Sequence, residues 1–304
     1  MSRSNDCGSI HRWSALSYTT STCSTIMCLL TIPLNTAVIV AIIKSGNYTS
    51  QFYMIMLNIA ISDLLLGVLT EPLGAALLIQ EGLGTGPKKA ELSTFLASLF
   101  VLGTSSVLSM ALLNIDRYLS IQFPAFYETL KEWHLLVSLS AIWLVSAFSG
   151  YLSLNIGFTR YLLIFSLCTV LFTVGVMFLT MRIFWKKLVS VTAPNDNRLS
   201  IDPDNQNSRV ATTKVFSIGR FRATSNQRRI IRTLFFMLAI FITSYFPVFL
   251  ACIYLNMCHE CDCLAVHILR DVVILAILVS SVARPINFLH RLSNLRNELR
   301  CLKR

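Results

Sequence analysis

The sequence predicts an all-α membrane protein, a bundle of seven transmembrane helices followed by a short cytoplasmic amphipathic eighth helix. Three observations lead to this prediction. The chain of 304 residues is 54% hydrophobic and 13% charged, whereas a soluble domain carries about 25% charged residues. Its apolar residues gather in seven long runs, and its basic residues stand between those runs. A net charge of +11 distributed in this way indicates membrane topology and not nucleic-acid binding.

Each apolar run is near or above the length that a helix needs to cross a bilayer, about 20 residues. Helices are expected because an open strand leaves backbone amides unpaired in lipid, and the runs lack the alternation of a barrel. The predicted spans are 24–43, 53–80, 93–122, 134–154, 161–185, 230–256 and 264–290. They form one domain, 24–290, between an extracellular segment, 1–23, and a cytoplasmic helix and tail, 291–304.

The distribution of Lys and Arg predicts the orientation. With the N-terminus outside, nineteen basic residues fall on the cytoplasmic side and six on the outer side. Basic residues favour the cytoplasmic side, so an extracellular N-terminus and a multi-pass plasma-membrane protein are expected. Residues 1–22 are polar and show no cleavable signal pattern, so the first span is expected to act as its own signal anchor.

One connection stands out by its length, the third inner one at 186–229. Its centre is polar and poor in aromatic residues, which predicts disorder. The basic residues at its two ends have two interpretations: anchors for anionic lipid, or a surface for a cytoplasmic partner.

Polar and proline landmarks recur in the predicted spans. The third span ends with Asp116, Arg117 and Tyr118 at its cytoplasmic end. The other landmarks, in chain order, are Asn35, Asn58, Asp63, Trp143, Pro247 and Pro285. This set resembles the signature of rhodopsin-like (class A) G-protein-coupled receptors, over about residues 24–302.

The resemblance implies a receptor that binds an extracellular ligand and activates a heterotrimeric G protein through Arg117. Pro247 breaks a backbone hydrogen bond and kinks the sixth helix, which suits it to swing its inner end outward. The sequence shows no set of nucleophile, base and oxyanion donors and no metal or phosphate-binding loop. It therefore predicts neither an enzyme nor a cofactor.

The seventh span departs from the family. Its members have Asn or Asp before the proline and Tyr three residues after it, whereas this chain has Arg284 and Phe288. In the family this position lies near a sodium ion with a second-helix aspartate and a third-helix serine, here Asp63 and Ser106; Ser280 is a further candidate. We hypothesise that Arg284 pairs with Asp63 and replaces the sodium ion. The alternatives are that Arg284 extends toward the inner headgroups and that Asp63 is a neutral packing residue.

The switch residues of the family are also altered. Tyr245 takes the place of the usual tryptophan below the ligand pocket, and Phe241 lies one turn below it. Gln227 stands where many members have an acid that locks Arg117, which predicts a looser inactive state. Phe288 lacks the hydroxyl of the family tyrosine, which makes weak coupling an equal expectation.

The cysteines place the chain near one group within the family. The third helix has Leu92 where most members have a cysteine, and the second outer loop has none. With the absent fifth-helix proline and a cysteine-rich third outer loop, this resembles the melanocortin, cannabinoid, lysophospholipid and adenosine receptors. The outer cysteines expected to form disulfides are Cys7, Cys23, Cys258, Cys261 and Cys263, with a zinc site as the alternative. Cys301 is a palmitoylation candidate or a plain membrane-surface cysteine.

The ligand class is narrowed by exclusion. Monoamine receptors carry an aspartate at the position of Leu99, and retinal needs a lysine that the seventh span lacks. A lipid or a small basic peptide is expected instead. The predicted pocket residues, each of which has plain helix packing as its alternative, are Glu71, Leu99, Leu102, Gly103, Tyr245, Phe249 and Asp271.

Two other classes stay open. A decoy or partner receptor, non-signalling or constitutively active, would explain the altered motifs. A seven-helix channel or pump would explain an intramembrane pair of Arg and Asp as an ion or proton path.

Overall fold

The computed structural model describes residues 14–46, 50–156, 160–168, 171–172, 175–176, 178, 182, 239, 242–243, 245–257 and 263–291. Within these ranges every regular element is helical. The elements are α1 (Ser14–Lys44), α2 (Gln51–Leu65), η4 (Leu66–Thr70), α3 (Glu71–Gly82), α4 (Lys89–Gln122), α5 (Pro124–Thr129), α6 (Glu132–Ile156) and α9 (Cys263–Arg291).

Five described helices are long and apolar enough to cross a membrane: Ser14–Lys44, Gln51–Gly82, Lys89–Ser120, Glu132–Ile156 and Leu264–Leu289. They correspond to the first, second, third, fourth and seventh predicted spans. Of the sixth, the apolar helix Tyr245–Met257 is described. The predicted fifth span is described without a break over 161–168 and only in part beyond that, and the eighth helix lies outside the described residues. Six predicted site residues also lie outside the described residues: Cys7, Gln227, Phe241, Cys258, Cys261 and Cys301.

The first helix begins at Ser14, not at the apolar boundary near residue 24 that the sequence suggests. The outer part of α1 is rich in Ser and Thr, and a subset of these side chains is buried against other helices. Thr20 donates to Asp271 of α9 over 2.8 Å, and Ser21 donates to the carbonyl oxygen of Ala75 in α3 over 3.0 Å. These polar residues continue the helix because other helices of the bundle supply their hydrogen-bond partners. Hydropathy along the sequence does not reveal such partners.

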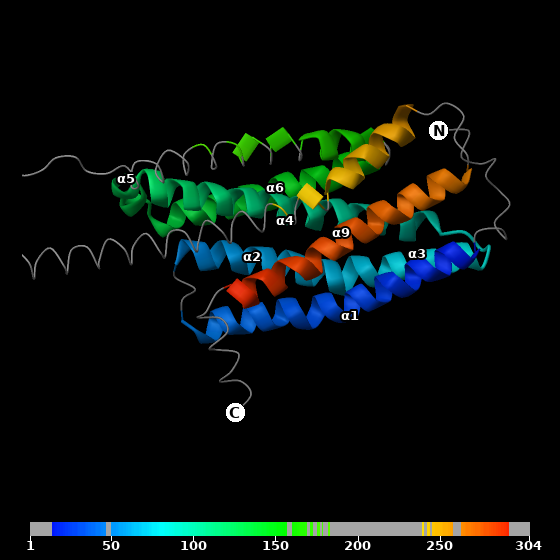
Figure 1. Ribbon diagram of the computed structural model, residues 1–304, viewed down its shortest axis with the longest axis horizontal. Coiled ribbons are helices and arrows are strands. Elements are labelled where there is room, and N and C mark those ends of the chain that lie inside the picture. The colour runs from blue at the N-terminus through cyan, green and yellow to red at the C-terminus, as the bar shows by residue number, and fades with distance from the viewer. Residues whose placement is uncertain are drawn as a thin grey trace, which may run out of the picture.

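The long helices run side by side (Figure 1). α4 packs against α2 and α6, and α1 packs against α2, α3 and α9. The second span is one helix with a single π-helical turn, η4, between α2 and α3. A π turn adds one residue to the helix, so the side chains after it are rotated by about 100°, one residue's share of a 3.6-residue turn.

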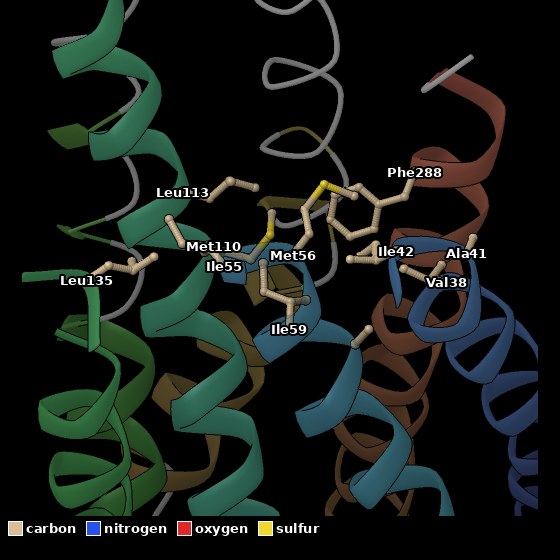
Figure 2. Close-up of a cluster of buried hydrophobic side chains, with 11 residues drawn as sticks. Val38, Ala41, Ile42, Ile55, Met56, Ile59, Met110, Leu113, Leu135 and Phe288 are labelled. Carbon is tan, nitrogen blue, oxygen red and sulfur yellow. The ribbon is translucent and has the colours of Figure 1, made fainter. Parts of the chain in front are cut away.

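The inner half of the bundle holds a cluster of buried apolar side chains from α1, α2, α4, α6 and α9 (Figure 2). The ring of Phe288 is 1% exposed and packs in this cluster, turned toward Met56. At this position a tyrosine hydroxyl would need a buried partner, so phenylalanine suits the apolar surroundings. Phe288 therefore belongs to the core that holds α9 against α1 and α2.

Candidate functional site

The centre of the bundle contains a buried ion pair between α2 and α9. Nη2 of Arg284 lies 3.2 Å from Oδ1 of Asp63. The two residues are 3% and 0% exposed, respectively. Arg284 faces the bundle interior, which is inconsistent with extension toward the headgroups.

Two serines hydrogen-bond with this pair, while Oδ2 of Asp63 is buried and has no hydrogen-bond partner among the described residues. Ser106 of α4 donates to Asp63 Oδ1 over 3.1 Å and accepts a hydrogen bond from Nη1 of Arg284. Nε of Arg284 donates to the Ser280 carbonyl oxygen over 3.0 Å, and Nη2 donates to the Ser280 hydroxyl over 3.1 Å. Every nitrogen of the guanidinium group therefore donates to this set. Charge-assisted hydrogen bonds of this kind offset the cost of burying the two charges.

The sixth span is connected to the same site through Tyr245. Its side chain is buried, packs against Val107 and Phe165, and hydrogen-bonds with Ser280. Tyr245, which stands below the predicted pocket, thus contacts Ser280, the residue that hydrogen-bonds with Arg284. A movement of this segment would be transmitted directly to the ion pair.

Glu71, one of the predicted pocket residues, is enclosed between helices. It is 1% exposed, and its Oε1 lies 3.2 Å from the hydroxyls of Thr31 in α1 and Ser281 in α9. The reason is the π turn directly before it, which changes the face on which α3 presents this side chain. No pattern in the amino-acid sequence indicates that extra residue.

Asp271 is likewise buried and not available at an open rim. It accepts hydrogen bonds from Thr20 and from Arg270. Arg270 also pairs with Glu81 of α3 over 2.8 Å, and His267 lies 3.1 Å from the same carboxylate. This network ties the outer ends of α1, α3 and α9 together, and the sequence analysis did not identify it.

The apolar residues predicted for the pocket lie in the packed interior. Leu99 belongs to a buried cluster with Phe100 and Val248, and Leu102 belongs to a separate one with Leu66. Gly103 is buried, whereas Phe249 is half-buried. The structure therefore supports the packing alternative for the two leucines.

At the inner end of α4, the charged triplet is held by a loop residue that the sequence analysis missed. Nε of Arg117 donates to Asp116 over 2.7 Å, and Arg117 lies over the ring of Phe52, 4.5 Å from its centroid. Tyr127 of α5 donates to the other oxygen of Asp116 over 2.9 Å and accepts from Arg117 over 3.3 Å. Tyr118 contacts the ring of Phe123 edge-on.

The surroundings of Tyr127 keep its phenol protonated. Burial, followed by the charge of Asp116 and the hydrogen bond to it, raises the pKa of Tyr127 to about 12. The hydroxyl thus donates to Asp116 at any physiological pH. The only sequence signal for this residue is a tyrosine in the loop after the triplet, which by itself predicts no contact.

Three further landmarks, Asn35, Asn58 and Trp143, form interhelical hydrogen bonds. Nε1 of Trp143 donates to Asn58 over 3.0 Å, and Asn58 donates to Ser109 over 2.7 Å. Asn35 donates to the carbonyl oxygen of Ser281 over 3.3 Å. Landmarks spread along the sequence therefore meet as polar contacts between helices.

Of the predicted disulfide cysteines, the structure describes the side chain of Cys23 alone. It is exposed and forms no disulfide with a described cysteine. The disulfides of the outer loops thus stay a prediction.

Comparison with known proteins relates part of this chain to a receptor family. Residues 34–160 match the family model for seven-transmembrane receptors of the rhodopsin family. The chain is 30% identical over 140 residues to the dog (Canis lupus familiaris) histamine H2 receptor, covering 46% of this chain and 38% of that protein. It is 27% identical over 130 residues to the rat (Rattus norvegicus) sphingosine 1-phosphate receptor 2, covering 41% and 35%.

These matches confirm the predicted fold class, an all-α bundle of seven transmembrane helices. The matched region spans well under half the length of each of these relatives. It contains Asp63, Ser106 and the triplet, whereas Arg284 and Tyr245 lie outside it. The ion pair thus joins a residue inside the region that matches the family model to a residue outside it.

The ion pair predicts non-additive effects of substitution. Asp63→Asn leaves a buried guanidinium without its counter-ion and should destabilise the protein by about 3–5 kcal/mol. Arg284→Met should also destabilise it, while the double variant should unfold closer to the wild type than Asp63→Asn does. Thermal unfolding of the purified protein in detergent measures this; additive losses in the double variant would contradict the pairing.

Proposed function

We propose, from the premise that this chain belongs to the rhodopsin-like family of seven-transmembrane receptors, that it binds an extracellular ligand and activates a heterotrimeric G protein. The family consists of receptors, and the chain is not an enzyme. It is a multi-pass membrane protein; we place it in the plasma membrane with its N-terminus outside, as the distribution of basic residues favours.

The observation that carries this proposal is the continuity of polar contacts from the centre of the bundle to the sixth span. Tyr245 hydrogen-bonds with Ser280, which in turn holds Arg284 beside Asp63. A ligand that moves Tyr245 changes the free energy of this set and shifts the population of helix arrangements. In the proposed cycle, that shift releases Arg117 from Asp116 and Tyr127 so that it contacts the G protein.

Arg284 gives this receptor a cation that is covalently part of the chain. In the proposed mechanism its guanidinium group takes the role that the resemblance assigns to a sodium ion beside Asp63. The support is the contact of 3.2 Å between the two side chains and the hydrogen bonds of both with Ser106. Asp63 is then neutralised at any sodium concentration.

A lipid or a small peptide with a basic group is the ligand class that we favour. The similar proteins include a histamine receptor and a sphingosine 1-phosphate receptor, so similarity alone admits an amine or a lipid. Leu99 stands where monoamine receptors carry their aspartate, and it packs in an apolar cluster. Without that carboxylate an amine has no counter-ion there, which favours a ligand with more apolar surface.

Arg117→Ala tests signalling directly. In cells that carry a promiscuous G-protein reporter, a ligand-library screen should yield an agonist for the wild type, and the response of the variant to that agonist should be at least tenfold lower. The two proteins are compared at equal surface expression. We expect the variant to reach it, because Arg117 is partly exposed and lies outside the central ion pair. A wild type that never activates a G protein, with or without ligand, would favour the decoy alternative.

Tyr127→Phe should raise basal signalling. The substitution removes a hydrogen bond to a charged group, worth about 1.5–3 kcal/mol, and so loosens the hold of Asp116 on Arg117. We expect roughly threefold to tenfold higher basal output in the same reporter. Tyr151→Phe, at an exposed tyrosine of α6, is the control. Equal basal output in wild type and Tyr127→Phe would show that this contact does not restrain Arg117.

Sodium should not affect the receptor through Asp63. Replacing sodium by N-methylglucamine at constant ionic strength should leave basal signalling and agonist affinity unchanged, because Arg284 occupies the position beside that carboxylate. Arg284→Met should introduce a sodium dependence. A sodium effect in the wild type that Asp63→Asn abolishes would refute the role given to Arg284.

A further inference from the structure

A second buried carboxyl, Glu71, lies outside the ion pair and has no function in the mechanism above. Its side chain joins three helices, because Oε1 lies 3.2 Å from both Thr31 Oγ1 in α1 and Ser281 Oγ in α9. Its second oxygen, Oε2, is buried and accepts no hydrogen bond within the described part of the chain. Glu71 is 1% exposed, so its carboxyl group is shielded from bulk water.

The hydrogen atoms around Glu71 are too few for an ionised carboxylate. The hydroxyl oxygens of Thr31 and Ser281 are also 3.2 Å apart, so three oxygens stand at the corners of a triangle. Ser281 is placed to donate both to the carbonyl oxygen of Leu278, at 2.7 Å, and to Glu71 Oε1, at 3.2 Å. Thr31 likewise faces two oxygens with one hydrogen. The two hydroxyls thus carry two hydrogens for four contacts, and a protonated carboxyl group supplies a third.

The charges lead to the same conclusion. Asp63 and Glu71 are two buried acids, and the guanidinium group of Arg284 is committed to Asp63, Ser106 and Ser280. An ionised Glu71 would leave one uncompensated negative charge in a region shielded from water. Such a charge is costly unless it is paired or neutralised.

No neighbouring helix supplies the compensating charge among the described residues. From α2, Asp63 acts on Glu71 as a like charge, and from α1 the thiol of Cys28 is the titratable group in electrostatic contact with it. On α9, the cation nearest in sequence to Ser281 is Arg284, which is held at Asp63. Residues 92–115 of α4 include no charged residue.

We propose that Glu71 is a proton-binding site that ties α3 to α1 and α9. The carboxylate takes up one proton from water, and the resulting acid donates it to the hydroxyl oxygen of Ser281 while it accepts from Thr31. The proton returns to water when the three helices separate. α1 packs against both α3 and α9 (Figure 1), so a bound proton stabilises this arrangement and its loss favours another. Proton binding at Glu71 adds a ligand to the receptor cycle and does not depend on the G-protein proposal.

Infrared spectroscopy of the full chain in lipid nanodiscs at neutral pH, without ligand, tests the site. The wild type should show the C=O stretch of a protonated carboxyl group, and Glu71→Gln should lose that band. Glu91→Gln, at a more exposed carboxylate paired with Lys88, should keep it and serves as the matched control. Neither ligand nor G protein is needed, so a failure here leaves the proposed receptor function untouched.

Ser281→Ala provides a second, milder variant if Glu71→Gln fails to fold. It removes the acceptor of the acid proton and should shift the band without abolishing it. Absence of the band in the wild type, or a band unchanged in both variants, would overturn the proposal. A wild type that lacks the band but gains thermal stability from sodium over N-methylglucamine would do so as well, because the site would then hold a metal ion.

Discussion

The buried pair of Asp63 and Arg284 is the constraint on which the polar interior depends. A guanidinium group inside a bundle must be neutralised and fully hydrogen-bonded, and this fixes the separation of α2, α4 and α9. Ser106 and Ser280 satisfy it with hydroxyls. The pair also connects α2, in the part of the chain that carries most of the landmark residues, to α9, the seventh predicted span. A motion of α2, α4 or α9 past one another has to break or rearrange this contact.

The π turn at Leu66–Thr70 has a consequence beyond its five residues. By rotating α3 relative to α2, it places Glu71 between α1 and α9, so that two acids of one transmembrane segment serve different contacts. Gly67 lies in this turn, and an added Cβ there would come within 2.9 Å of the Thr31 methyl group. A glycine at this position therefore permits the close approach of α1 that brings Thr31 to Glu71.

The two ends of the bundle are fastened differently. At the outer end, Glu81, His267, Arg270 and Asp271 form a charged network between helices. At the inner end, Arg117 is held by the adjacent Asp116, by Tyr127 and by the ring of Phe52. The ion pair at the inner end joins two adjacent residues, whereas the outer network includes a pair between α3 and α9. In the proposed function, release of Arg117 from these inner contacts therefore does not itself require an interhelical ion pair to break.

The sequence by itself determined the helical class, the number of spans and the polar landmarks, because lipid requires long apolar helices and penalises unpaired charges wherever they fall. It also predicted which acid Arg284 would meet, since a buried cation must find a buried anion. Tertiary structure alone decided where Glu71 and Asp271 point, how far α1 extends and that Tyr127 reaches Asp116. The first two depend on the rotation of one helix against another or on a partner distant in the chain. The Tyr127 contact depends on how α5 folds back against the end of α4. None of these leaves a periodic signal in the residues.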